Sequence, residues 1–173
     1  MTQLDVATIA NIVNTVVLIL TLAVLIVSIR QNTQSQKVVA VQSLTSAIAA
    51  INVPAMESPM LGNAILNATR DWAGAERNDR IVAHYFLFCY FKLAEQAWFQ
   101  HKAKVLDEAQ WRGWENGMRM FYHSPGVKDF WWPQRKSAYA AEFQAHIAAS
   151  TPPDSGMSNV SAIFDPAPRA TAT

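Results

Sequence analysis

The side chains that could do chemistry in this chain are few and scattered. In 173 residues there are four histidines and one cysteine. Zinc and iron sites usually take their ligands from short motifs such as HExxH or CxxC, and no such spacing joins these residues. They are His84, His101, His123, His146 and Cys89. We therefore expect no metal and no cofactor; a composite site built from distant histidines is the alternative.

Acid–base and nucleophilic groups form no recognisable catalytic motif either. Glu142 and His146 lie four residues apart, a spacing that on a helix is typical of an exposed ion pair. Cys89 lies in an apolar segment, where free cysteine usually fills space, and a couple with His84 or His123 would need a proximity that spacing does not show. No nucleophile elbow, phosphate-binding loop or dinucleotide fingerprint is present. We predict that the protein is not an enzyme.

Glu95 is the charged residue whose position is most informative. It follows a long apolar run and precedes Trp98. A carboxylate in such surroundings has to be paired or hydrogen-bonded. We predict a structural ion pair with Arg119, Arg135 or Lys136 that joins two helices, in preference to a catalytic acid.

Tryptophan supplies much of the large apolar surface of the chain. The six tryptophans are Trp72, Trp98, Trp111, Trp114, Trp131 and Trp132. Most should pack between helices, but six exceed what a small core easily hides, so one or two are expected to meet a partner or the membrane interface. Trp131 and Trp132 are adjacent and point in different directions on a helix. We predict that at least one of them lies on a partner-binding surface.

The element that must position everything else is an uncharged run of 24 residues, Val6 to Ile29, between Asp5 and Arg30. A helix of that length extends ~36 Å, enough to cross a hydrocarbon core of ~30 Å. No Lys or Arg precedes the run, its apolar part is long, and no small-x-small cleavage site follows it, so a signal peptide is disfavoured. The run predicts a single membrane-spanning helix that stays in the mature chain.

The flanking charges predict the orientation of this span. Arg30 and Lys37 follow it, whereas the preceding residues offer only Asp5. By the positive-inside rule residues 30–173 lie in the cytoplasm and the N-terminus lies outside. The single cysteine agrees, because it excludes an internal disulfide framework. We expect a single-pass protein of the bacterial inner membrane.

Polar residues within the span form a stripe rather than a scatter. With Leu18 and Leu25 between them they recur at spacings of 3 and 4, and Asn32 and Ser35 continue the pattern. The stripe consists of Asn11, Asn14, Thr21 and Ser28. Asparagine amides that face lipid would lack partners, so the stripe should face another transmembrane helix, either its own copy or a different subunit. The alternative is that Asn11 is solvated near the membrane surface. The span has no histidine, so we expect no haem or chlorophyll in it.

Beyond the span the pattern is helical throughout. Val41, Leu44, Ile48 and Ile51 recur at spacings of 3, 4 and 3, so this face should pack on the domain, and Pro54 should end the helix. We predict an all-α protein with one transmembrane helix that continues into a stalk, then a compact domain of about four to five helices and a disordered tail. The boundaries are 6–29 for the span, 30–52 for the stalk, 53–150 for the domain and 151–173 for the tail, whose one apolar element is Ile163 and Phe164.

Capping signals place the helices of the domain. Ser58 with Pro59 begins a helix to about residue 70, and Asp107 with Gln110 forms a capping box for a helix to about residue 122. Between them a helix over 77–102 is apolar on nearly every side, which predicts burial. A helix after Ser124 should be broken or kinked by Pro133, and a last helix should run to about residue 150.

Several of these residues together resemble a widespread family of uncharacterised bacterial proteins with one N-terminal membrane helix and a small helical domain. The resemblance covers about residues 5–148. It rests on the run from Leu93 to Gln100, on Leu106-Asp107-Glu108 with Trp111, on Ser124-Pro125-Gly126, and on Trp131-Trp132, Arg135, Tyr139 and Phe143. Where the family usually has a glycine before the Leu-Asp pair this chain has Lys104-Val105, and where charged residues usually follow the Trp pair it has Pro133. The resemblance implies topology and fold but no activity.

The net charge of +1, from 14 basic and 13 acidic residues, supplies no field that would attract nucleic acid, so we expect no nucleic-acid partner. With no catalytic motif, the sequence favours a non-enzymatic, membrane-anchored interaction protein, an accessory subunit of a larger respiratory, photosynthetic, transport or secretion assembly. The first alternative is a self-associating membrane sensor or regulator. A membrane-tethered enzyme with a composite site is the more distant alternative.

Overall fold

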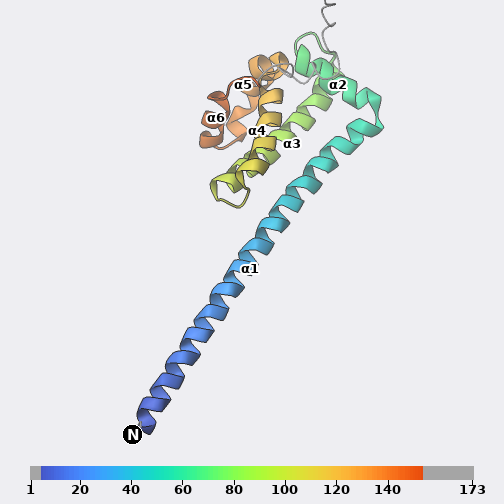
Figure 1. The fold of residues 1–173 in the computed structure, drawn as a ribbon. Coiled ribbons are helices and arrows are strands. Elements are labelled where there is room, and N and C mark those ends of the chain that lie inside the picture. The colour runs from blue at the N-terminus through green and yellow to red at the C-terminus, as the bar shows by residue number, and fades with distance from the viewer. Residues whose placement is uncertain (1–4, 154–173) are drawn as a thin grey trace, which may run out of the picture. The chain divides into compact units, whose positions relative to one another are not determined.

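A computed structural model of the chain describes residues 5–153, all of whose regular elements are helical (Figure 1). The helices are α1 (Val6–Glu57), α2 (Pro59–Arg70), α3 (Arg77–Lys102), α4 (Glu108–Tyr122), the π-helix η1 (Gly126–Trp131), α5 (Trp132–Arg135), the 3-10 helix η2 (Lys136–Ala138) and α6 (Ala141–Ala148). The predicted all-α class is confirmed. Ile163 and Phe164 lie outside the described residues, and so does most of the predicted tail.

The chain divides into two compact units, Met1–Ala40 and Val41–Thr173. In the first unit α1 is long and apolar enough to cross a membrane, and none of its most apolar stretch is buried. The second unit includes the last turns of α1. There Leu44 is 1% exposed, and Val41 and Ile48 pack against the same core, so the predicted apolar face of this segment is confirmed.

The expectation that Pro54 ends the first helix is wrong. α1 continues for one more turn to Glu57, and Ser58 N–H donates to Pro54 O at 3.1 Å. Proline removes one backbone donor, which a helix tolerates in its last turn. The break falls at Ser58, which is extended at φ −127° and ψ 102° because Pro59 disfavours the helical conformation of the residue before it. Pro59 then takes the first position of α2, as predicted.

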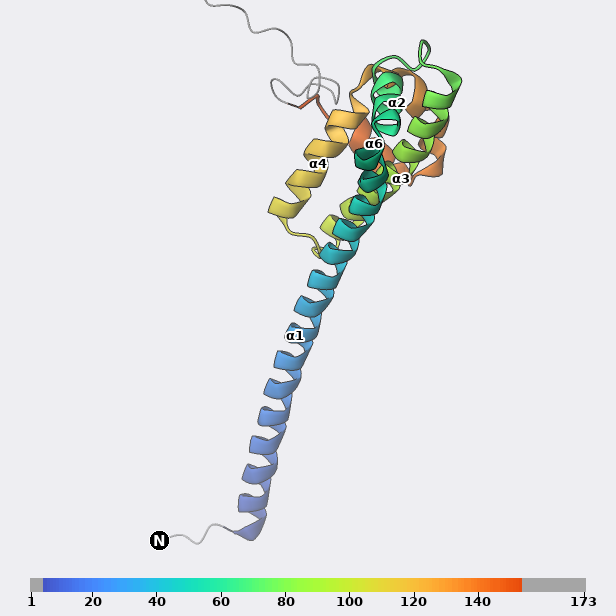
Figure 2. The ribbon, with the colours of Figure 1, turned by 90° about the vertical axis from the view of Figure 1, so that its right-hand side faces the viewer.

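α3 is the centre of the second unit. It packs against α2 and α4, and with α4 it forms a helical hairpin (Figures 1 and 2). Leu87, Phe91 and Ala94 of α3 have no exposed surface. α4 begins with the predicted capping box, in which Asp107 accepts from Gln110 N–H at 2.8 Å. Its Met118 is fully buried in the core.

The expectation that α3 is buried on every side is wrong. Its Ile81 is 40% exposed, Tyr85 is 66% exposed and Phe99 is 43% exposed, and Cys89 is exposed as well. α2 and α4 cover two sides of the helix, and the described residues leave part of its surface uncovered. Cys89 is therefore not the buried filler that its apolar neighbours in the sequence suggested.

Pro133 does not break the helix that contains it. The backbone stays helical from Gly126 to Ala138 and changes its winding from π to α at Trp132, so that Pro133 lies in the first turn of α5, where its missing N–H matters least. Tyr139 is extended at φ −116° and ψ 156°, and the last helix begins only after it.

Gly126 allows η1 to approach α2 closely. A Cβ atom at this position would lie 2.1 Å from the carbonyl oxygen of Ala68 and 2.8 Å from that of Thr69. No side chain fits at such distances, so the contact between η1 and the C-terminal turn of α2 requires glycine.

Candidate functional site

The polar stripe of the predicted span lies on α1 with all four side chains exposed. Thr21 Oγ1 donates to Val17 O at 2.8 Å, so its hydrogen is used within the helix. The side-chain amides of Asn11 and Asn14 form no hydrogen bond with any residue between 5 and 153. These two amides are the least satisfied polar groups of the apolar stretch.

The expectation that Trp131 or Trp132 lies on the surface is wrong. Trp131 is 1% exposed and Trp132 is 5% exposed. Trp131 stacks on Phe91 of α3 at 5.6 Å between ring centroids, and Trp132 stacks on Tyr139 at 5.0 Å. The two rings do point in different directions, as adjacent helical residues must, but packed elements receive both of them. Neither ring is a partner-binding surface.

Glu95 forms a structural ion pair, as predicted, but with a different partner. Its Oε2 lies 2.9 Å from Lys92 Nζ, one turn away on α3, and among the described residues it forms no ion pair with Arg119, Arg135 or Lys136. Its Oε1 accepts from Ala140 N–H at 2.6 Å, and Lys92 also donates to Ala138 O. The pair therefore fastens α3 to the segment between η2 and α6. Glu95 is 12% exposed, so these partners satisfy a nearly buried carboxylate.

Glu142 and His146 do not pair with each other. Glu142 pairs with Lys102 at 2.5 Å, and His146 Nε2 lies 3.7 Å from Glu115 Oε1. Both partners, Lys102 of α3 and Glu115 of α4, belong to the α3–α4 hairpin. The side chains of the short α6 therefore reach across to that hairpin.

The structure brings two of the four histidines together. His101 and His146 both lie against Trp111, at 5.2 and 5.7 Å between ring centroids. Within residues 5–153 no group of three or more histidine, cysteine or acidic side chains has a geometry that could hold a metal ion. Burial, opposed in part by Glu115, lowers the pKa of His146. The described residues therefore pack this pair around the indole ring of Trp111.

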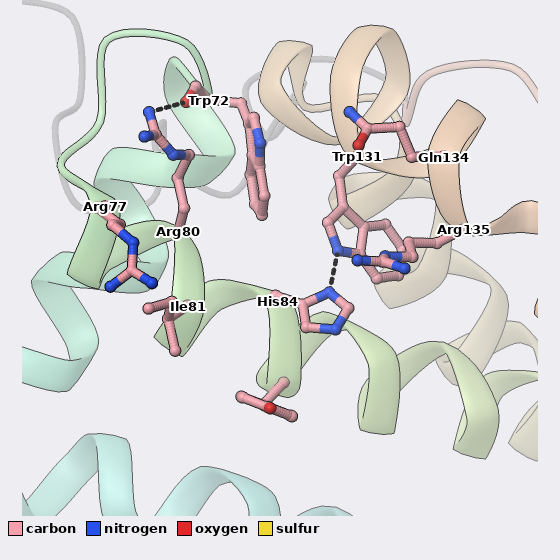
Figure 3. Close-up of a pocket in the computed structure, with 9 residues that line it drawn as sticks. Trp72, Arg77, Arg80, Ile81, His84, Trp131, Gln134 and Arg135 are labelled. Atoms are coloured by element: carbon pink, nitrogen blue, oxygen red, sulfur yellow. Dashed lines mark hydrogen bonds between the residues drawn. The ribbon is translucent and has the colours of Figure 1, made fainter.

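A cleft lined by arginines opens between α3, α5 and the loop that follows α2, with a volume of about 360 Å³ (Figure 3). We call it the arginine cleft. It is lined by Trp72, Arg77, Arg80, Ile81, His84, Tyr85, Trp131, Gln134 and Arg135. Within residues 5–153 no acidic side chain lines it. In Figure 3, Arg77 and Arg80 lie on one side of Trp72, and Trp131, Gln134 and Arg135 lie on the other.

The three arginines of the cleft differ in their bonding. Arg80 donates to the backbone oxygens of Trp72, Ala73 and Ala75, at 3.4, 3.2 and 2.7 Å, and so holds the loop between α2 and α3 that forms one wall. Arg77 and Arg135 make no hydrogen bond or ion pair with any described residue. Two guanidinium groups thus remain available for an anion.

His84 lies at the floor of the cleft in one tautomer. Trp131 Nε1 donates to His84 Nδ1 at 3.1 Å (Figure 3). An indole N–H can only donate, so Nδ1 must accept, and the neutral ring carries its proton on Nε2. Burial and, second, the charge of Arg135 lower the pKa of His84. The neutral ring therefore persists to lower pH than in a free histidine.

An apolar groove of about 310 Å³ lies beside the arginine cleft. It is lined by Ala50, Ile51, Pro54, Ala55, Leu61, Ile65, Val82, Tyr85, Phe86 and Cys89. Tyr85 belongs to both recesses. The exposed cysteine of the chain thus lies in an apolar depression, and the described structure brings neither His84 nor His123 to it as a catalytic partner.

The arginine cleft was not predicted from the sequence. One signal was present: Arg77, Arg80 and His84 recur at spacings of 3 and 4 and therefore share a face of the predicted helix over 77–102. Trp72 and Arg135 come from other elements, and no spacing along the chain connects them to that face.

Comparison of the chain with protein-family models, with curated proteins and with solved structures finds no match. The resemblance to the bacterial family thus remains a prediction, and function has to be argued from the described residues alone.

Proposed function

We propose that this protein is a non-enzymatic, membrane-anchored interaction protein, an accessory subunit that α1 holds in the bacterial inner membrane beside other transmembrane helices. Its helical domain would lie on the cytoplasmic side. α1 supplies one helix of sufficient length and apolarity for this role.

The observation that carries the proposal is the pair of unpartnered amides on α1. Asn11 and Asn14 are exposed and form no hydrogen bond with any described residue. In hydrocarbon no water is present to satisfy them, and an amide on a neighbouring helix is the usual partner. The other members of the stripe, Thr21 and Ser28, have small hydroxyl side chains, which allow a second helix to approach along the same face.

The test is the purification of the full chain from its native membrane in a gentle detergent, with mass spectrometry of the proteins that accompany it. We expect foreign membrane subunits at a fixed ratio to the wild type. The double variant Asn11→Leu, Asn14→Leu should lose most of them. Val16→Leu with Val27→Leu is the matched control, because both residues lie on the opposite side of the helix from the stripe.

Two outcomes would contradict the proposal. Unchanged co-purification in the asparagine variant would show that the stripe is not the contact. If only copies of the chain itself are recovered, the protein is a self-associating sensor or regulator instead of an accessory subunit.

The proposed orientation has a separate test at Cys89, the only cysteine and an exposed one. A membrane-impermeant maleimide added to intact spheroplasts should leave Cys89 unlabelled, and it should label the same residue after lysis. Labelling before lysis would place the domain outside and reverse the topology.

A further inference from the structure

The arginine cleft and the apolar groove together offer two kinds of surface to one ligand. The cleft contributes Arg77, Arg135 and the Nε2–H of His84, all of them donors without a described acceptor. The groove contributes aliphatic and aromatic side chains, among them Ile51 and Phe86. A ligand that satisfies both has an anionic head and an apolar chain.

The two recesses adjoin each other along α3, where they share Tyr85. Ile81 and His84 line the cleft, Val82 and Phe86 line the groove, and Tyr85 lines both. These residues lie within two turns of one helix. Tyr85 is 66% exposed, so its ring can contact a chain that passes from one recess to the other.

The charges near the cleft favour an anion. Among the described residues no acidic side chain lines it. Of the acidic groups nearby along the chain, Asp71 accepts from Gly74 N–H at 3.0 Å and Asp79 accepts from Asn67 at 2.9 Å, whereas Glu76, which precedes Arg77, makes no capping hydrogen bond and does not line the cleft. A carboxylate matches the planar guanidinium group and can accept two hydrogen bonds from it. The Nε2–H donor of His84 is fixed in place, because Trp131 Nε1 donates a hydrogen bond to the other ring nitrogen, Nδ1.

We propose that the arginine cleft and the apolar groove form a single binding site for a long-chain fatty acid, with the carboxylate in the cleft and the acyl chain along the groove. The groove, at about 310 Å³, is at the lower end of the size of ligand pockets, which suits one chain better than the two chains of a phospholipid.

Cys89 provides the test, because it lies in the groove, is exposed and is the only cysteine. The full chain is reconstituted in nanodiscs of phosphatidylcholine, and the rate of its reaction with N-ethylmaleimide is measured with and without palmitic acid. At a concentration ten times the Kd, the reaction should be about tenfold slower, because about one site in ten stays empty. Palmitic acid methyl ester lacks the charge and acetate lacks the acyl chain, so each should protect Cys89 little.

The matched variants separate specific binding from partition into the bilayer. Arg77→Gln with Arg135→Gln should shift the protection curve to more than tenfold higher palmitic acid, because two charge-assisted hydrogen bonds are lost. Lys128→Gln with Arg112→Gln removes two exposed cations outside the cleft and should leave the curve unchanged.

Other outcomes overturn the proposal. Equal protection by the methyl ester, or equal protection in both double variants, would mean that the acid acts through the bilayer. Slow reaction in phosphatidylglycerol discs without palmitic acid would identify a phospholipid as the occupant. If Cys89 reacts slowly with N-ethylmaleimide only when a disc holds several copies of the chain, the occupant of the groove is a second copy.

Discussion

Two apolar regions of this protein are built from different kinds of side chain. Between Val6 and Ile29 the apolar residues are aliphatic, with no aromatic ring, and every described side chain from Thr8 to Ile29 is exposed. The second unit contains all six tryptophans, and its core is built from aromatic contacts around Phe91. Aliphatic residues suffice for a helix that meets hydrocarbon, whereas a core that has to exclude water in one arrangement uses rings of defined shape.

The polar groups of the two regions differ in whether they find their partners within the chain. In the second unit, Glu95 is nearly buried and fully engaged with Lys92 and Ala140. On α1 the amides of Asn11 and Asn14 have no described partner. A polar group completed within the chain stabilises the fold, and one left incomplete points to another molecule.

The largest difference between the regions should appear when a large side chain is removed. Trp131→Ala should reduce the free energy of unfolding of the second unit by about 3–5 kcal/mol, because a fully buried ring leaves a cavity. Leu22→Ala, at a position 57% exposed, should change it little. Denaturant unfolding of the full chain in detergent, followed by tryptophan fluorescence, reports on the second unit only, since residues 1–40 contain no tryptophan. Similar losses in both variants would contradict the comparison.

Two glycines of the second unit should respond with opposite signs. Gly126→Ala places a methyl group 2.1 Å from Ala68 O and should destabilise the unit by about 1–3 kcal/mol. Gly113→Ala, in α4, meets nothing within 4 Å and should stabilise it by about 0.5–1 kcal/mol, because alanine is the better helix former. The same fluorescence measurement applies. If Gly126→Ala proves neutral, η1 and α2 do not approach each other as described.

Breaking the contacts of Glu95 with Lys92 and Ala140 should reduce the free energy of unfolding less than removing a core side chain does. Glu95→Ala leaves Ala140 N–H without its acceptor and removes the carboxylate partner of Lys92, which still donates to Ala138 O. It should destabilise the second unit by about 1–3 kcal/mol, whereas Glu95→Gln keeps a neutral acceptor and should cost less. Glu142→Gln, which breaks an exposed pair with Lys102, should cost at most about 1 kcal/mol. The structural role of Glu95 is wrong if neither Glu95 variant loses more stability than this surface control.

The smallest expected effect is a dependence on pH that belongs to the second unit alone. Burial lowers the pKa of His84, His123 and His146 below the ordinary value of 6.5. The folded state therefore favours the neutral rings. Their contribution to stability is complete above pH 6.5 and is lost as the pH falls through the lowered values. Thermal unfolding of the full chain should show a lower Tm at pH 5.5 than at pH 7.5, with a smaller difference in His84→Gln. An equal Tm at the two pH values would contradict this.

Local signals predicted the helices well because their causes are local. Asp107 with Gln110, and Ser58 with Pro59, place helix starts through bonds and backbone angles that involve only neighbouring residues. The effect of Pro54 was overestimated, since a proline in the last turn of a helix removes only one backbone N–H donor. The prediction that Glu95 pairs with Arg119, Arg135 or Lys136 was wrong. Lys92, one turn away on α3, competes well with any cation that is distant along the chain.

The sequence alone determined the apolar length of α1, its polar stripe, the all-helical class and most helix boundaries. These properties follow from composition, from the 3.6-residue period and from capping, all of which are fixed within a few turns of chain. Only the tertiary structure decided that Trp131 and Trp132 are buried, that Cys89 is exposed, and that Arg77 and Arg135 line one cleft. Burial depends on which elements cover a helix, and a site assembled from α3, α5 and a loop has no spacing along the chain that announces it.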